Sequence, residues 1–152
     1  MTSVTIIRKG EKKDIPSLLT LIQELATYEK QPDAVVVTEE ILMNDGFGAN
    51  KIFEFFVAEL EGKVVGIALY YAKYSTWKGR CLFLEDIIVE EQYRNRGIGK
   101  KLMDEIVKTA EAQKVKRLEW QVLDWNEPSI AFYKKYKTIF DGEWINCKLE
   151  WE

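Results

Sequence analysis

The sequence predicts an α/β fold in which helices cover both faces of a mixed sheet. Segments rich in β-branched and aromatic residues alternate with helical patterns in the order β-α-α-β-β-β-α-β-α-β. Two strand patterns, ending at Val89 and Leu123, each lead into a helix, and such strand ends leave a crevice outside a sheet. A chain of 152 residues can bury a sizeable core, so residues 1–152 are expected to form a single domain.

The first half of the chain predicts two helices between strands. Asp14 is a suitable N-cap, and Pro16 fits the first helical turn, where its missing N–H costs nothing. Pro32 prevents that helix from continuing, and Thr38 is expected to cap a second, shorter helix. The elements expected here are a strand over 4–8, a helix ending near 28–30, a helix broken by 45–48, and strands over 53–60 and 64–74 joined by a turn at 61–62.

The second half contains an apolar strand that leads through a glycine loop into an amphipathic helix. Ile98, Leu102 and Ile106 recur at helical spacing on one face of that helix. Asn126 and Pro128 suit the cap and the first turn of a last helix. The elements expected here are a strand over 82–89, a helix from 98 to near 113, a strand over 116–123, a helix around 126–133 and a final alternating strand over 144–151.

The composition is that of a soluble globular protein, with 47% apolar and 31% charged residues. No apolar run approaches the roughly 20 residues of a membrane span, and the N-terminus lacks the shape of a signal peptide. Cys81 and Cys147 lie in strand-like segments without metal-ligand spacing, so both are expected to be buried thiols. We therefore expect a cytoplasmic protein with no membrane partner.

The chain contains no histidine, which excludes Ser-His-Asp and Cys-His catalysis and the commonest metal ligand. Proton transfer must then use a carboxylate, Tyr, Lys, Cys or water. The net charge of −3 is unevenly spread, because residues 23–62 hold nine acidic and two basic residues while residues 94–117 hold eight basic and three acidic ones. These segments are either two solvated faces or sites for a cationic and an anionic ligand. An acidic chain without a basic tail argues against nucleic acid.

The loop Arg94-Asn95-Arg96-Gly97-Ile98-Gly99 stands where a strand gives way to a helix. Free amides and a positive dipole at a helix start bind anions, and glycine lets the backbone approach a phosphate. The glycines alone are weak evidence, since a dinucleotide fingerprint and a P-loop spacing are both absent, and a structural turn is the alternative. Arg94 and Arg96 beside the helix start favour a pyrophosphate.

Glu85-Asp86 interrupts the apolar strand over 82–89 with two carboxylates. Neighbours on a strand face opposite sides, so at least one carboxylate should point into protein or a cleft. The alternatives are a structural salt bridge or β-bulge, or a base or cation-binding group at the crevice. Trp77 is either a packing residue, which the sequence favours, or an exposed platform, and Tyr133 could likewise be core.

Together these stretches resemble the GNAT N-acetyltransferase superfamily, whose acetyl-CoA signature is Arg/Gln-x-x-Gly-x-Gly/Ala. The likeness extends to the spermidine/spermine (diamine) acetyltransferases and is closest to their thialysine acetyltransferase branch. The stretches that carry it are residues 28–29, 45–48, 70–71, 74–80, 84–86, 94–99, 122–129 and 132–134. The resemblance implies a mostly antiparallel mixed sheet with a splayed central strand pair, no metal, and a homodimer.

The resemblance also implies roles for individual residues. Tyr133 would protonate the departing CoA thiolate, and Glu85 would take the proton of the amine. Acetyl-CoA would be held by Ile87, Ile88, Val89, Arg94, Asn95, Arg96, Gly97, Ile98, Gly99, Lys100, Asn126 and Tyr133. The amine would be held by Tyr28, Glu29, Ser75, Trp77, Glu85 and Asp86.

The expected activity is direct transfer of acetyl from acetyl-CoA to a primary amine of a small substrate, a thialysine- or lysine-like amino acid or a diamine or polyamine. Ser75 stands where the polyamine enzymes carry an acid, which favours the smaller amines. Lys137-Thr138 replaces the family's Gly-Ala after the last helix. The alternatives are a protein lysine or N-terminal acetyltransferase and a catalytically silent CoA-binding module.

Overall fold

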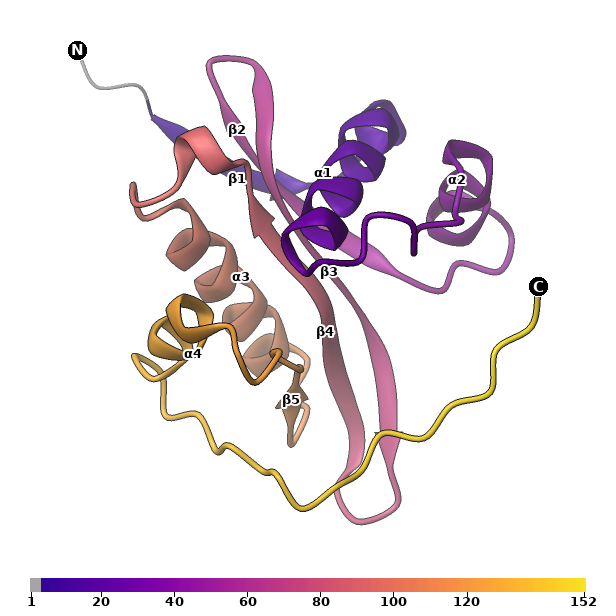
Figure 1. The fold of residues 1–152 in the computed structure, drawn as a ribbon, viewed down its shortest axis with the longest axis vertical. Coiled ribbons are helices and arrows are strands. Elements are labelled where there is room, and N and C mark those ends of the chain that lie inside the picture. The colour runs from indigo at the N-terminus through magenta and orange to yellow at the C-terminus, as the bar shows by residue number, and fades with distance from the viewer. Residues whose placement is uncertain (1–3) are drawn as a thin grey trace. The chain divides into compact units, whose positions relative to one another are not determined.

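The computed structural model describes residues 4–152, which fall into two compact units, one running to Gln121 and one from Val122 to Glu152. The first unit contains a five-stranded sheet (Figure 1). Its strands, in spatial as in chain order, are β1 (Thr5–Lys9), β2 (Glu54–Leu60), β3 (Lys63–Ser75), β4 (Gly79–Val89) and β5 (Leu118–Glu119). The pairings from β1 to β4 are antiparallel and β4 pairs with β5 in parallel, so the predicted mixed, mostly antiparallel sheet is confirmed.

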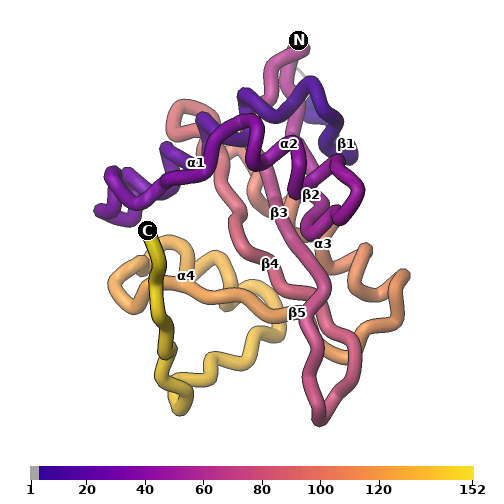
Figure 2. Tube along the Cα trace, turned by 90° about the vertical axis from the view of Figure 1, so that its right-hand side faces the viewer, coloured from indigo at the N-terminus to yellow at the C-terminus, as the bar shows by residue number. Residues whose placement is uncertain are grey.

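Helices cover both faces of this sheet, as predicted (Figures 1 and 2). On one face, Leu18, Leu21 and Leu42 pack with Val57 and Ile67 in a buried core. The other face carries a helix whose apolar stripe is fully buried and which approaches the sheet closely at a glycine: a Cβ on Gly66 would lie 3.1 Å from Leu102 Cδ1. The helices are α1 (Ile15–Tyr28) and α2 (Glu39–Phe47) on the first face and α3 (Ile98–Ala112) on the second, with short 3₁₀ turns η1 (Lys12–Asp14) and η2 (Glu91–Tyr93).

Asp14 stands at the N-cap position of α1, but its side chain makes no cap hydrogen bond. Instead it accepts two hydrogen bonds from Arg8, at 2.8 and 2.9 Å, and one from the Glu11 amide at 2.7 Å. Burial opposes ionisation of this carboxyl, but the hydrogen bonds from Arg8 and the amide hold its pKa below the ordinary value. Asp14 therefore connects the start of α1 to β1 through a partly buried ion pair with Arg8 rather than as a cap.

Two predicted boundaries in the first unit are wrong. Helix α2 continues through residues 45–47, because Gly46 is buried within it and faces the Phe53 ring, and the helix ends only at Gly48. The strand predicted over 116–123 shrinks to Leu118–Glu119, which pair only with Leu82 and Phe83. A strand pattern in the sequence indicates that a segment can join a sheet. How many of its residues pair depends on how far the neighbouring strand runs alongside it.

The unit from Val122 to Glu152 holds α4 (Glu127–Tyr133), and the expected cap is confirmed, since Asn126 Oδ1 accepts from the Ser129 amide at 3.4 Å. The strand predicted over 144–151 is wrong: this unit has no strand beside that segment to complete a ladder, and the segment is exposed. Cys147 is exposed with it, so its expected burial is also wrong, while Cys81 is buried as expected. Across residues 4–152, no helix is both long and apolar enough to cross a membrane.

Candidate active site

The centre of the site is a β-bulge in β4. Leu69 on β3 lies opposite Asp86, but the next residue, Tyr70, lies opposite Leu84, so Glu85 is an extra residue in the ladder. The two carboxylates therefore leave the simple strand alternation, with Glu85 exposed and Asp86 partly buried. Of the two structural alternatives for Glu85-Asp86, the bulge is found.

Glu29, at the C-cap of α1, joins Glu85 and Asp86 in a carboxylate cluster. Burial, then the charges of Glu85 and Glu29, raise the pKa of Asp86 to about 7. Burial, then the charge of Glu85, also raises the pKa of Glu29. The three groups repel one another in partly desolvated surroundings, and a cationic ligand would relieve that repulsion.

Tyr71 was not predicted from the sequence to be a site residue, but it donates a hydrogen bond to one carboxylate of the cluster. Its hydroxyl donates to Glu85 Oε1 at 2.7 Å, and its ring stacks on Phe83 with centroids 5.5 Å apart. Burial and this hydrogen bond raise the pKa of Tyr71 well above its ordinary value, so the phenol stays a donor at neutral pH. The sequence carries no signal for the pair, because the bulge sets which residues of β3 and β4 face each other.

The edge of β4 that faces away from β3 has a short strand partner. Strand β5 pairs with it at Leu82 and Phe83, and among the described residues of the first unit no strand pairs with residues 84–89 on that edge. Open strand edges bind extended chains through backbone N–H and C=O groups. Ile87, Ile88 and Val89, expected to pair with a pantetheine arm, lie on this open stretch.

The glycine loop forms a helix start with exposed amides. Gly97 is the N-cap of α3, with a left-handed φ of 79°, and Asn95 is also left-handed at 65°. The amides of the first helical residues, Ile98 to Lys100, have no carbonyl within the helix to bond. No acidic residue lies in this first turn. The loop therefore fits a pyrophosphate.

The basic side chains beside this loop have different partners. Arg94 turns toward α1: its Nε donates to the Val89 carbonyl at 2.9 Å and its guanidinium lies 5.2 Å from the Tyr28 ring centroid. An ion pair of 3.9 Å with Glu24 extends the same contact. Arg96 lies over the Tyr93 ring at 5.3 Å, and Lys100 pairs with Asp104 at 2.7 Å. Arg94 thus links the end of β4 to the end of α1, next to Glu29.

The turn between β3 and β4 holds two residues expected to bind substrate. Ser75 Oγ accepts hydrogen bonds from the amides of Trp77 and Lys78, each at 3.1 Å, so Ser75 shapes this turn. Trp77 is 79% exposed, so the packing role that the sequence favoured is wrong. Its indole is a free apolar surface beside the chain's longest strand pair.

In the second unit, Tyr133 ends α4 and is buried, with its ring edge-to-face to Phe132 at 5.4 Å. Asn126, also buried, starts the same helix. Thr138 donates from Oγ1 to the Tyr133 carbonyl at 2.7 Å. This bond satisfies a carbonyl at the end of α4.

Comparison with known proteins decides the family. The chain matches the acetyltransferase (GNAT) family over residues 16–137. It belongs to this family. A thialysine N-epsilon-acetyltransferase of Bos taurus is 42% identical over 152 residues, covering 93% of this chain and 89% of that protein. Spermidine/spermine N(1)-acetyltransferase-like protein 1 of Homo sapiens is 37% identical over 134 residues, covering 84% of this chain and 19% of that protein.

Solved structures share the GNAT fold. An aminoglycoside acetyltransferase from a soil metagenomic sample, in complex with sisomicin, superposes with a TM-score of 0.79 at 19% identity over 97% of both chains. Aminoglycoside N-acetyltransferase AAC(6')-Iy, in complex with CoA, gives 0.78 at 17% identity over 98% of this chain and 97% of that one. This GNAT protein is therefore an acyltransferase with the fold that the sequence predicted.

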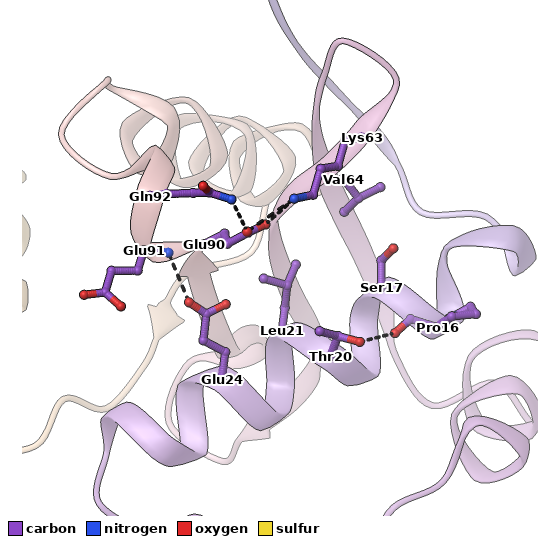
Figure 3. A pocket seen from close by; sticks show the side chains of 10 residues that line it. All are labelled: Pro16, Ser17, Thr20, Leu21, Glu24, Lys63, Val64, Glu90, Glu91 and Gln92. Atoms are coloured by element: carbon purple, nitrogen blue, oxygen red, sulfur yellow. Dashed lines mark hydrogen bonds and ion pairs between the residues drawn. The ribbon is translucent and has the colours of Figure 1, made fainter.

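This GNAT acetyltransferase also has a groove of about 820 Å³ away from the carboxylate cluster (Figure 3). It lies between α1, the start of β3 and the turn after β4, and Ser17, Thr20 and Glu24 line its α1 side. Glu90 is tied down there by Lys63 at 3.2 Å and by Gln92 at 2.6 Å. None of Glu29, Glu85 and Asp86 lines this groove, so its volume does not mark the site.

Proposed function

We propose that this GNAT acetyltransferase transfers the acetyl group of acetyl-CoA directly to a primary amine of a small cationic substrate in a ternary complex. The carboxylate cluster of Glu29, Glu85 and Asp86 carries this proposal. An alkyl ammonium group supplies a positive charge that relieves the repulsion within the cluster, and removing its proton requires a base of the kind that the cluster contains.

Acetyl-CoA supplies an acyl group activated as a thioester. The amides after Gly97 would bind its pyrophosphate and the open edge of β4 would pair with its pantetheine arm, as the loop geometry and the short β4–β5 ladder support. Asn126 and Tyr133 would complete the cofactor site, a role that rests on the resemblance to the family. Arg96 and Lys100 lie at the loop and would add positive charge.

Glu85 would act as the base. An ammonium group with a pKa near 10.4 is neutral in only about one molecule in 2,500 at pH 7, which is a deficit of roughly 4.6 kcal/mol. A carboxylate next to the amine, acting directly or through water, removes that proton as the nucleophile attacks. Glu29 and Asp86 would hold the remaining positive charge of the substrate, and Tyr28 and Trp77 would line its chain.

Tyr133 would donate a proton to the departing thiolate. Replacing it in Tyr133→Phe should lower kcat by about 10- to 100-fold, as expected for loss of a general acid, with a smaller effect on acetyl-CoA affinity. Single-turnover kinetics and calorimetry with acetyl-CoA separate the two effects. Wild-type turnover in this variant would refute the acid role.

The proposed substrates are thialysine or a lysine-like amino acid, with diamines and polyamines next. Their support is the thialysine acetyltransferases that the chain resembles at 42% identity and the use of Ser75 in a turn rather than as a charged ligand for a long polycation. The sulfur in thialysine lowers the pKa of its amine, which reduces the cost of deprotonation.

A thiol-release screen tests the activity. Acetyl-CoA is offered with thialysine, lysine, putrescine, spermidine or spermine, and thialysine or lysine should give the highest kcat/KM. Thiol release only with a lysine-bearing peptide would favour a protein acetyltransferase. Binding of acetyl-CoA without thiol release for any amine would leave a silent CoA-binding module.

We also propose that residues 1–152 act as one acetyltransferase domain, that the enzyme is a cytoplasmic homodimer, and that it needs no metal, nucleic acid or membrane. The family match spans both units, which supports a single functional domain.

Exposed apolar side chains at the C-terminal end support an interface between two copies of the chain. They are Ile139, Trp144, Ile145, Leu149 and Trp151. Sedimentation of the purified chain should give twice the monomer mass. A monomer at all concentrations would exclude the homodimer.

A further inference from the structure

Tyr71 is a neutral hydrogen-bond donor to the carboxylate cluster, from a residue of β3 that is not among the proposed catalytic or substrate-binding residues. Its hydroxyl donates to Glu85 Oε1 at 2.7 Å. We propose that Tyr71 is a positioning residue, which orients the Glu85 carboxylate so that its other oxygen faces the amine. This inference rests on the proposed role of Glu85 as base and extends it.

The position of the Tyr71 hydroxyl is fixed by the packing of its ring. The ring stacks on Phe83, its partner in the β3–β4 ladder, with the planes 29° apart. Lys73 Nζ lies 5.2 Å from the Phe83 ring centroid and also pairs with Glu119 at 3.3 Å. Phe83 therefore contacts both Tyr71 and Lys73, and the phenol stacked on it reaches Glu85 at the bulge.

The bulge makes this contact possible. Because Glu85 is the extra residue on β4, its side chain is displaced from the regular alternation and reaches the hydroxyl of a residue that pairs elsewhere in the ladder. A bulge commonly re-aims a side chain in this way next to an active site. The hydrogen bond from Tyr71 holds this displaced carboxylate in one orientation.

The hydrogen bond also distinguishes Glu85 from the other two carboxylates of the cluster. Glu85 accepts a hydrogen bond from a neutral phenol, whereas for Asp86 on β4 and Glu29 on α1 burial and neighbouring charge raise the pKa. A cluster in which one carboxylate is oriented by a hydrogen bond while its neighbours hold a proton more tightly can assign base and binding roles to different residues.

The matched pair Tyr71→Phe and Tyr70→Phe tests the inference. Tyr70 is the neighbouring residue, its hydroxyl donates to Glu54 at 2.9 Å, and its ring stacks on Phe56, so its variant loses an equivalent bond away from Glu85. Tyr71→Phe should lower kcat by about 10-fold and move the acidic limb of the rate profile to higher pH. Tyr70→Phe should change kcat less than about 3-fold and leave the limb in place. Phe keeps both ring stacks, and thermal unfolding checks each fold.

A double-mutant cycle with Glu85→Gln identifies the partner. In the Glu85→Gln background, adding Tyr71→Phe should change kcat less than about 2-fold, because no carboxylate remains to be oriented. An equal loss from Tyr71→Phe in both backgrounds would overturn the inference.

Failure of the inference and failure of the proposed function give different results. If no amine supports thiol release in the wild-type enzyme, the proposed function fails, and the carboxyl ¹³C chemical shift of Glu85 still tests the contact. That chemical shift should change in Tyr71→Phe and stay in place in Tyr70→Phe. An unchanged chemical shift in Tyr71→Phe would overturn the inference whatever the activity.

Discussion

The carboxylate cluster, two of whose members are Glu85 and Asp86 on β4, and the glycine loop that follows β4 depend on different physical effects. The cluster depends on side chains: burial, repulsion between Glu29, Glu85 and Asp86, and one hydrogen bond from Tyr71. The loop depends on backbone: a left-handed Gly97 and the free amides of α3. We therefore expect isosteric side-chain substitutions in the cluster to lower activity strongly. In the loop, the backbone torsion angle at each position should decide how much a substitution lowers stability and acetyl-CoA binding.

The largest effect is expected for Glu85→Gln, which keeps the shape of the side chain and removes its charge. Loss of a general base should lower kcat/KM at pH 7 by about 100- to 1,000-fold and shift the rate profile to higher pH. Thiol release measured across pH checks this. Glu54→Gln is the control, because Glu54 also accepts from a tyrosine, and it should stay within about 3-fold. A profile that does not move would exclude Glu85 as base.

In the loop, Gly97→Ala and Gly99→Ala separate torsion from space. Gly97 has open space around it but a φ of 79°, so alanine should cost about 1–2 kcal/mol of unfolding free energy. At Gly99 an added Cβ would only touch Val89 Cγ2 at 3.8 Å, so stability should hold. Urea unfolding measures both, and calorimetry with acetyl-CoA should show weaker binding for Gly97→Ala. Equal stability of the two variants would contradict the assigned strain.

Arg94 links the glycine loop to the end of α1 beside the carboxylate cluster, whereas Arg96 contacts Tyr93 in the turn before the loop. Arg94→Ala loses the bond to the Val89 carbonyl and the contact with the Tyr28 ring, so we expect about 1–2 kcal/mol lower stability and a higher KM for the amine. Arg96→Ala, which loses only an exposed contact with Tyr93, should affect the KM for acetyl-CoA and little else. If Arg94→Ala changed only the acetyl-CoA KM, Arg94 would be a phosphate ligand rather than a link.

The stability of the fold should also depend on pH. The pKa of Asp86 is about 7 in the fold against an ordinary 3.8, so the folded state holds this proton more tightly than the unfolded state. The stability that Asp86 contributes is complete below about pH 3.8 and is lost as pH rises through about 7. Urea unfolding should show this fall between pH 5 and 7.5, and Asp86→Asn should flatten it. Glu29→Gln, which removes a neighbouring charge, should move the fall to lower pH.

The sequence predicted short-range structural features more completely than it predicted the edges of the fold. The glycine loop, the Asn126 cap and the Glu61-Gly62 turn were predicted because each depends on residues close together in the chain. The final strand over 144–151 was not, because its alternating pattern describes a segment able to form a strand and not the neighbour with which it would pair.

The sequence by itself determined which segments form α1, α3 and the β3–β4 pair, and that a carboxylate pair interrupts β4, because local periodicity and composition govern these features. Only the tertiary structure decided that Glu85 is a bulge residue held by Tyr71, that Arg94 turns toward Tyr28, and that Trp77 is exposed. Those outcomes depend on the register between β3 and β4 and on packing between distant elements, and the free energy of such contacts is not encoded in any one stretch of residues.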